Sequence, residues 1–342
     1  MKTVAHLIRR SLLGGLAASF LCASAQAQSV EQFYKGKTLH SLVGLSAGGG
    51  NDLQMRLVAR HLGKHIPGKP TVVPQNMIGA AGLVMANYLY RAAPQDGTYI
   101  GLLSNTLPSR QAVGLDGVQY DASKFGWIGS ISNTVEILLL WKTTGVTSIE
   151  DAKKQEIIVG GVGTGGIGSS YPRMINEFLG TKFKVIEGYP GSPQLDLAME
   201  RGEVFGRAHT WSGVKASKPQ WLANKDAYVL VYGGIKPPDL NGVPSLEELI
   251  ADPANRQVVG IVLAGLKLGY PFTATPGVPA DRLKALRDAF QAVLTDPEFL
   301  KETEAMKVDL SPVSWQEMTA VVDATLTAPP DVRERAKAFF AE

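Results

Sequence analysis

The chain has 342 residues, of which 45% are hydrophobic and 19% are charged, and its formal net charge is +3. The basic excess lies entirely within the first 27 residues, and the remainder carries 31 basic and 31 acidic side chains. A neutral remainder gives no electrostatic basis for binding nucleic acid or an anionic membrane, and its length suffices for two domains of ordinary size.

The N-terminal segment has the anatomy of a secretory signal peptide. Lys2, Arg9 and Arg10 precede an apolar stretch over residues 12–23, and Ala25-Gln26-Ala27 offers a small-x-small cleavage site. The apolar stretch is shorter than the roughly 20 residues of a membrane span, which argues against the alternative of an N-terminal anchor. The arginine pair loosely resembles a twin-arginine signal, so the export route stays open. We expect cleavage near Ala27, a periplasmic location, and a mature chain without cysteine.

After this segment, short β-rich runs alternate with amphipathic helical patterns, as in βαβ units. Two glycine turns, at 48–50 and 161–166, indicate two similar α/β lobes, each a mainly parallel sheet flanked by helices. We predict signal peptide 1–27, lobe one from residues 28–137 and 251–342, and lobe two from residues 138–250. Strands are predicted at 38–45, 71–73, 99–104, 127–130, 137–141, 156–160, 184–187, 202–207 and 228–232. Helices are predicted at 51–64, 82–92, 148–154, 170–179, 193–201, 279–295, 296–306 and 314–326. The return to lobe one is expected as a Pro-rich linker near 235–260, with the C-terminal helices packed on lobe one.

The first glycine turn is the most informative feature of the chain. An apolar strand pattern stops at Gly48, Gly49 and Gly50, and an amphipathic helix pattern follows at once. Glycine lets the backbone approach a ligand closely, and the unpaired amides of a helix start favour negative charge. The turn therefore predicts a site for a carboxylate or phosphate that needs no cationic side chain.

The second glycine turn has two interpretations. Residues 161–168 satisfy G-x-G-x-x-G twice after an apolar strand pattern, and Glu187 follows about twenty residues later, as in a dinucleotide-binding turn. An exported NAD(P)-dependent oxidoreductase is therefore the alternative function. The same glycines serve equally well as a second anion site, with Thr164, Ser169 and Ser170 as hydroxyl donors.

Two further patterns are weaker. The run Gly44 to Gly48 fits the nucleophile elbow G-x-S-x-G, but three glycines separate Ser46 from the helix. His61 and His65 have the i, i+4 spacing of metal ligands, yet no H-E-x-x-H pattern or carboxylate cluster accompanies them in the sequence. We expect no catalytic residue, no metal and no cofactor.

Several segments, in consistent order over nearly the whole mature chain, resemble the extracytoplasmic substrate-binding receptors of tripartite tricarboxylate transporters. The resemblance implies a two-lobed, type II periplasmic-binding-protein clamshell that closes on a small organic carboxylate and delivers it to membrane permease subunits. It also implies a monomer without catalytic activity. The matching segments are Leu42–Arg56, Val72–Gly82, Ala92–Leu103, Gly160–Tyr171, Tyr189–Gly191 with Leu195, Arg201–Val204, Thr275–Pro279 and Asp296–Glu298.

Carried onto this chain, the resemblance implies ligand contacts from both lobes. In lobe one they are Ala47, Gly48, Gly49, Asn51, Asp52, Gly79, Ala80, Ala81, Ser104, Asn105 and Thr106. In lobe two they are Gly163, Thr164, Gly165, Ser169, Ser170 and Tyr189, with Arg207 and the segment around His209.

The chain departs from the family pattern at Ser46-Ala47, at Asn51, in the run Gly206–Trp211 and over 258–270. Arg207 and His209 alternate within a predicted strand and so share one face. We predict that Arg207 contacts a second anionic group of the ligand in a bidentate manner, the alternative being an ion pair at the surface or between the lobes. A dicarboxylate, a tricarboxylate, an aromatic acid and a neutral amide all stay open as ligands, and so does a role in sensing.

Overall fold

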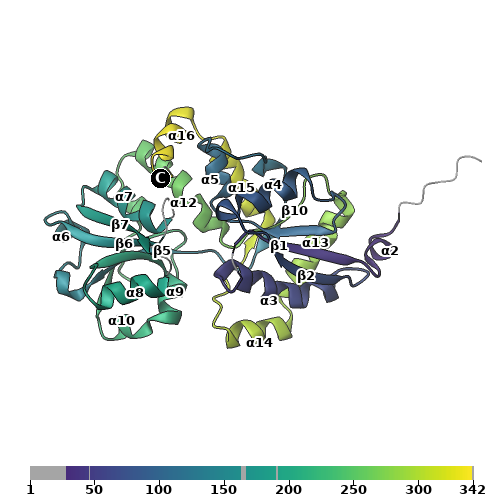
Figure 1. Cartoon of the computed structure of the whole chain (residues 1–342), viewed down its shortest axis with the longest axis horizontal. Coiled ribbons are helices and arrows are strands. Elements are labelled where there is room, and N and C mark those ends of the chain that lie inside the picture. The colour runs from purple at the N-terminus through teal and green to yellow at the C-terminus, as the bar shows by residue number, and fades with distance from the viewer. Residues whose placement is uncertain (1–27, 46, 163–166, 190–191, 341–342) are drawn as a thin grey trace, which may run out of the picture.

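The computed structural model describes residues 28–45, 47–162, 167–189 and 192–340, so the predicted signal peptide lies outside it. Two α/β lobes stand side by side, each built on one sheet (Figure 1). Across the described part of the chain, no helix has the length and apolar character needed to cross a membrane.

The sheet of lobe one has six strands within the described residues, in the order β11-β4-β10-β3-β1-β2. Strand β1 pairs in parallel with β2 and β3, whereas the β10–β3, β10–β4 and β11–β4 pairs are antiparallel. Both β10 and β11, which the sequence did not predict, come from the chain after its return from lobe two. The strands are β1 (Thr38–Val43), β2 (Thr71–Asn76), β3 (Tyr99–Leu102), β4 (Gly126–Ser130), β10 (Phe272–Ala274) and β11 (Val313–Ser314).

Helices cover this sheet through apolar faces that repeat at helical spacing. Met55, Val58 and Leu62 of α3 are buried in one cluster with Leu286 and Phe290 of α13. The helices of lobe one are α2 (Val30–Tyr34), α3 (Gly50–His65), η1 (Ala80–Gly82), α4 (Leu83–Arg91), α5 (Leu107–Ala112), η2 (Ala122–Lys124), α13 (Ala280–Leu294), α14 (Pro297–Ala305) and α15 (Trp315–Leu326).

The described sheet of lobe two has the order β7-β6-β8-β5-β9, with β6 parallel to β7 and β8 and with β5 antiparallel to β8 and β9. The strand predicted at 202–207 begins only at Gly206, as strand β8. The residues before it form a turn after α8, in which the backbone N–H of Glu203 donates to Ala198 O. The strands are β5 (Glu136–Trp141), β6 (Ile157–Val162), β7 (Phe183–Tyr189), β8 (Gly206–Thr210) and β9 (Ala227–Gly233). The helices are η3 (Lys142–Thr144), α6 (Ile149–Ala152), α7 (Ile167–Leu179), α8 (Ser192–Glu200), α9 (Trp211–Ser217), α10 (Pro219–Ala223) and α11 (Leu246–Leu249).

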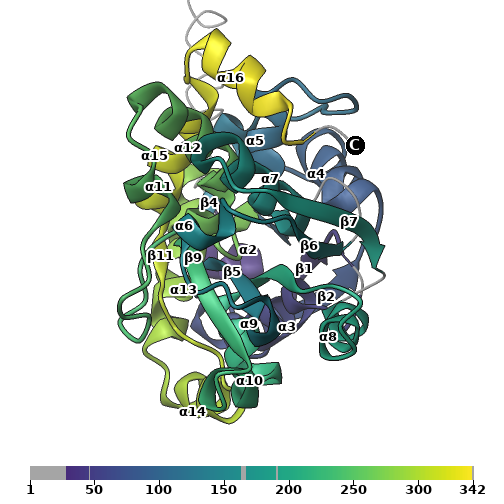
Figure 2. The ribbon, with the colours of Figure 1, turned by 90° about the vertical axis from the view of Figure 1, so that its left-hand side faces the viewer.

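Successive side chains of β5 point to opposite faces of the sheet, so they divide the core of lobe two into two layers. Ile137 and Leu139 pack with α8, α9 and α10, whereas Leu138 and Leu140 pack with α7 on the opposite face (Figure 2).

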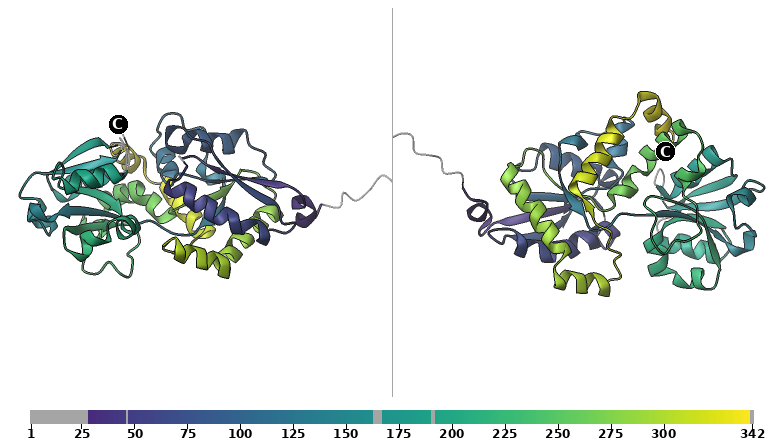
Figure 3. Two further views of the ribbon diagram at one scale, coloured as in Figure 1. Left: turned by 60° about the horizontal axis from the view of Figure 1, so that its bottom comes forward. Right: turned by 180° about the vertical axis from the view of Figure 1, so that it is seen from behind.

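Two C-terminal helices join that second layer. Val258 and Val262 of α12 (Pro253–Leu268) and Val332 of α16 (Pro330–Lys337) are buried in the same cluster as Leu138 and Leu140. The last part of the segment predicted as a return linker, from Pro253 on, is instead the start of helix α12, which lies between the lobes (Figure 3). Helices α13, α14 and α15 pack on lobe one, as predicted for the C-terminal helices, whereas α16 packs mainly beside α12. The residue boundaries of the two lobes stay a prediction.

Both sheets are flanked by helices, which confirms the predicted two-lobed α/β class, but both are mixed rather than mainly parallel as predicted. Every antiparallel pair in the described sheets includes β10 or β11, which follow the return to lobe one, or β5, the first strand of lobe two.

Candidate functional site

The turns that follow β1, β2 and β3 meet at one edge of the first sheet. A Cβ atom added to Gly44 would lie 2.7 Å from Gly82 Cα, and one added to Gly82 would lie 3.4 Å from Ser104 Cβ. Parallel strands bring their carboxyl ends to the same edge, which is where open α/β sheets bind ligands. The predicted lobe-one residues 47–49, 79–81 and 104–106 all belong to these three converging turns.

The first glycine turn presents exposed backbone at the start of a long helix. Ala47, Gly48 and Gly49 are exposed, and α3 begins at Gly50 with Gly49 as its N-cap. No side chain of the described residues caps this end. The first amides of α3 therefore point outward without side-chain partners, as an anion site at a helix start requires.

Asp52, predicted as a ligand contact, is used inside the turn. Its carboxylate accepts hydrogen bonds from Arg56 Nε at 2.9 and 3.0 Å, from Asn76 Nδ2 at 2.9 Å and from the backbone N–H of Gly48 at 2.8 Å. The bond from Arg56 is the main cause that lowers the pKa of Asp52 to about 2. Asp52 is 2% exposed, so its role here is to tie Gly48 to β2.

The second turn is strained. Ala80 has φ 45° and Ala81 has φ 52°, in the left-handed region that residues with a Cβ rarely adopt, and Gly79 precedes them. Such strain costs on the order of 1–3 kcal/mol per residue and clusters at ligand sites. Arg110 Nη1 donates to Ala80 O at 3.3 Å and supports the turn from α5.

The third turn is adjacent to the helix between the lobes. Ser104 Oγ and Thr106 Oγ1 are 3.1 Å apart and share a hydrogen bond. A Cβ atom on Gly265 of α12 would lie 2.8 Å from Asn105 O, so Asn105 packs directly on α12. Asn51 Nδ2 donates to Leu103 O at 3.5 Å, which links the first turn to the third.

The predicted residues of lobe two that the structure describes lie on α7, β7 and β8. Gly163, Thr164 and Gly165 lie outside the described residues. Ser169 is fully buried and its Oγ has no hydrogen-bond partner among the described residues, whereas Ser170 Oγ donates to Phe339 O at 2.5 Å. Ser170 therefore faces the C-terminal segment.

Two other lobe-two residues bear on the predicted functions. Tyr189 is half-buried at the end of β7. Glu187, the acid of the dinucleotide interpretation, forms an ion pair with Arg173 at 3.0 Å.

Arg207 and His209 share one face of β8, opposite Leu139 and Ile137 of β5. The guanidinium of Arg207 is 3% exposed, forms an ion pair with Asp196, and donates to Ser192 O at 3.1 Å and to Ser192 Oγ at 3.0 Å. The ion-pair alternative is thus present, buried within lobe two rather than at the surface or between the lobes. Burial and the nearby Arg207 lower the pKa of His209 to about 3, so its ring is neutral.

A cavity of about 700 Å³ lies between the lobes. Gly50, Leu53 and Gln54 of α3 line it from lobe one, and Gln54 Oε1 is buried without a hydrogen-bond partner in the described structure. Its size suits a small organic ligand. The other lining residues are Ser132, Asn133, Val135, Thr210–Gly213, Lys215, Ala216, Ile235–Asp239, Tyr270 and Lys307–Ser311.

Among the residues that the structure describes, none of those predicted individually for the site lines this cavity, although Gly50 adjoins Gly49 and Thr210 and Trp211 belong to the predicted segment around His209. Sequence reasoning missed Tyr270 and Gln54, which carry no local signal because their position depends on how the lobes meet. Trp211 had a signal, because it lies in the segment around His209 that the resemblance had already singled out.

An ion pair joins the lobes across the cavity wall. Lys215 of α9 lies 2.6 Å from Asp239 Oδ2 and 3.2 Å from Asp309 Oδ2 of lobe one. Trp211 Nε1 donates to Asp239 Oδ1 at 2.9 Å, so an aromatic ring and an ammonium are fixed by the same carboxylate.

A scan against protein-family models and a search of curated proteins gave no match. Solved structures, in contrast, are similar over most of the chain. A TctC solute-binding protein from Polaromonas, solved without ligand, has a TM-score of 0.67 and 18% sequence identity to this chain. The match covers 90% of this chain and 98% of the Polaromonas protein. MatC from Rhodopseudomonas palustris with bound malate has a TM-score of 0.61 and 19% sequence identity. The match covers 87% of this chain and 99% of MatC.

Rpa4515 from R. palustris with adipate has a TM-score of 0.62 and 20% sequence identity. The match covers 88% of this chain and 97% of Rpa4515. Near-complete coverage of these proteins confirms, at the level of the fold, the resemblance found in the sequence. The chain therefore has the two-lobed periplasmic-binding-protein fold of the TctC-type solute-binding proteins.

Proposed function

We propose that this protein is an extracytoplasmic receptor that captures a small organic carboxylate between its lobes and delivers it to the permease subunits of a tripartite tricarboxylate-type transporter. The observation that carries the proposal is the convergence of three turns, one with uncapped helix amides, beside a cavity lined by both lobes. Two proteins with the same fold were solved with malate and with adipate, which are both carboxylates.

The charges near the cavity indicate how a carboxylate is held. Arg56 and Arg207 are engaged by Asp52 and Asp196, and Lys215 is engaged by two aspartates. None of these three cations is free, so we assign the first carboxylate to the uncapped amides beside the first glycine turn. Charge-assisted hydrogen bonds contribute roughly 1.5–3 kcal/mol each, so four to six of them approach the roughly 8 kcal/mol of micromolar binding after ordering costs.

A second anionic group of the ligand needs a cationic partner other than Arg207, which was predicted for this role. Lys236 and Lys307 line the cavity, are exposed, and form no ion pair within the described residues. They replace Arg207 as the partners of a distal carboxylate. A monocarboxylate with an aromatic body would instead pack on Trp211 and Tyr270, which line the same cavity.

Closure of the lobes links capture to delivery. A ligand that contacts both lobes shifts the population toward the closed form, and the permease distinguishes that form by its shape. The receptor acts as a periplasmic monomer and catalyses no reaction.

The test compares two substitutions at one residue. Gly49 has φ −77° and precedes α3, so proline fits its backbone and removes only the N–H group. Gly49→Ala keeps this N–H and is the matched control. Wild type and both variants of the mature chain are screened by thermal shift, then by calorimetry, against di- and tricarboxylates, aromatic acids, nicotinamide and NAD(P).

We expect saturable stabilisation by at least one carboxylate, and affinity at least about tenfold weaker in Gly49→Pro than in Gly49→Ala. Stabilisation by NAD(P) with no response to any carboxylate would instead support the oxidoreductase. Equal carboxylate affinity in both variants would remove the N–H of Gly49, the residue that caps the helix, from the site.

A further inference from the structure

Two histidines and three carboxylates meet where α3 packs on α14, outside the residues that line the interlobe cavity. His61 and His65 come from one face of α3, one turn apart. Asp296, Glu298 and Glu302 follow more than 230 residues later in the chain, on α14 and its N-cap. The sequence showed the histidine pair without any carboxylate, and the fold supplies three.

The ring of His61 is oriented by a carboxylate on its far side. Its Nε2 lies 2.7 Å from Glu302 Oε2. Glu302 Oε2 accepts the Nε2 proton of His61 at this distance, while its other oxygen, Oε1, accepts from Arg60. With its proton on Nε2, the ring of His61 keeps a lone pair on Nδ1. Metal-binding histidines are held in this way, with the second ring nitrogen donating to a carboxylate.

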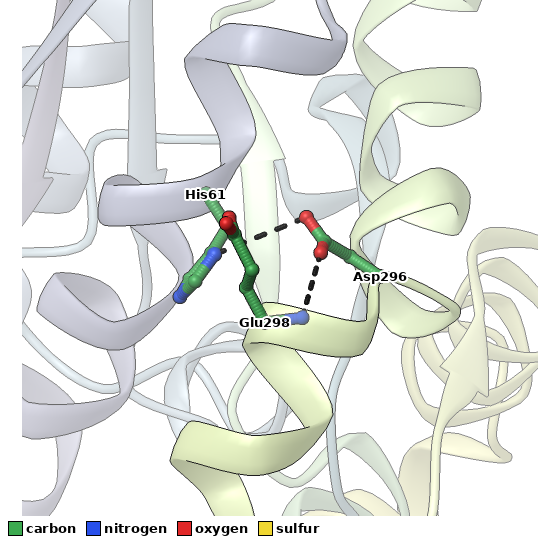
Figure 4. Close-up of side chains that lie close together, drawn as sticks. All are labelled: His61, Asp296 and Glu298. Atoms are coloured by element: carbon green, nitrogen blue, oxygen red, sulfur yellow. Dashed lines mark hydrogen bonds and ion pairs between the residues drawn. The ribbon is translucent and has the colours of Figure 1, made fainter.

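The lone pair of His61 faces another acceptor. Nδ1 lies 3.9 Å from Asp296 Oδ2, and ligand atoms of His61, Asp296 and Glu298 all lie within 4.8 Å of one another (Figure 4). His65 Nε2 lies 2.9 Å from the same Asp296 oxygen. Bonds of about 2.0–2.2 Å to a tetrahedral ion separate neighbouring ligand atoms by roughly 3.3 Å, so small side-chain rotations complete the geometry.

Asp296 is fixed in place for this role by its position at the helix start. Its Oδ1 accepts the N–H of Glu298 at 3.0 Å as the N-cap of α14, which turns Oδ2 toward the histidines. The side chain of Asp296 is 6% exposed and that of His61 is 10% exposed, so both groups are shielded from solvent.

A cation already occupies the space between the carboxylates. Lys64 Nζ lies 2.6 Å from Asp296 Oδ2 and 2.5 Å from Glu298 Oε2. The Lys64 side chain is 39% exposed and flexible, so it can swing into solvent when another cation enters.

We propose that His61, Asp296 and Glu298 bind a divalent transition-metal ion of the Zn²⁺ class, with His65 as the fourth ligand and Glu302 orienting His61. Imidazole and carboxylate ligands in a small tetrahedral group suit Zn²⁺ better than Mg²⁺ or Ca²⁺, which prefer oxygen ligands in larger shells. The ion displaces the Lys64 ammonium and clamps α14 to α3.

The experiment titrates the mature full-length protein, stripped with EDTA, with ZnCl₂ by calorimetry and thermal shift, and with MgCl₂ and CaCl₂ in parallel. We expect one saturable Zn²⁺ site per chain, a raised melting temperature with Zn²⁺, and no comparable shift with Mg²⁺ or Ca²⁺. Co²⁺ in place of Zn²⁺ should give the visible absorption of a tetrahedral site.

Three variants separate a metal site from a plain network of ion pairs. His61→Gln and Asp296→Asn should weaken Zn²⁺ binding at least tenfold, and Asp296→Asn retains the N-cap oxygen. Lys64→Met removes the competing ammonium and should strengthen Zn²⁺ binding at least threefold. An ion-pair network alone predicts only lower stability for Lys64→Met.

Absence of saturable Zn²⁺ binding in both wild type and Lys64→Met overturns the proposal, and so does equal affinity in wild type and His61→Gln. Carboxylate binding measured in EDTA is independent of either result.

Discussion

Asp196→Asn is expected to destabilise lobe two strongly, because it leaves the buried guanidinium of Arg207 without a counter-charge. The side chains of Arg207 and Asp196 are 3% and 4% exposed, so solvent cannot replace the lost carboxylate. Breaking one partner of a buried pair costs about 3–5 kcal/mol, and a neutral amide keeps the shape while removing the charge. Glu136, the other nearby acid, is held mainly protonated by burial and compensates little.

The assay is urea unfolding, followed by circular dichroism and by tryptophan fluorescence. Fluorescence reports on both lobes, because lobe two holds Trp141, Trp211 and Trp221 and lobe one holds Trp127 and Trp315. Glu203→Gln is the matched control, because its pair with Arg201 spans 3.9 Å and both side chains are more than half exposed. Exposed pairs of this kind contribute little, so the control midpoint should not move.

A loss below about 1 kcal/mol in Asp196→Asn, with the control unchanged, would refute the reasoning that burial makes this pair structural. The ligand provides a second check. If Arg207→Met kept wild-type stability and lost carboxylate affinity, the guanidinium would be a ligand contact, as the sequence first suggested.

Three further outcomes are expected. Burial raises the pKa of Glu136 to about 8, so its folded form holds a proton that the unfolded chain releases above the ordinary value near 4.5. Stability should therefore fall from about pH 5 to pH 8 in wild type and change less in Glu136→Gln, as urea midpoints will report. Gly44→Ala should lower the melting temperature and weaken carboxylate binding, because its Cβ would lie 2.7 Å from Gly82 Cα. Asp309→Asn should break the contact with Lys215 and increase the radius of gyration in small-angle scattering, and an unchanged radius would mean that this pair does not hold the lobes.

The local pattern of apolar and polar residues was sufficient to predict helices that bury one face and expose the other to solvent. The helix predicted at 51–64 matches α3 within one residue at each end, because one face is buried and the other is solvated. Helix α12 escaped prediction because its second half is buried almost all round, so no apolar stripe stands out at helical spacing. The strand at 202–207 was misplaced because an apolar run there closes a turn before β8 begins.

Each glycine turn lies between a strand and a helix, and this arrangement is encoded in a short segment of the chain. The amino-acid sequence was therefore enough to predict it. What each polar group does depends on partners that sequence separation conceals. Asp52 is engaged by Asn76, Arg207 by Asp196, and His61 by Glu302 at a separation of 241 residues. Backbone conformation follows from neighbours along the chain, whereas charges are satisfied by whatever the packing of the lobes brings within a few ångströms.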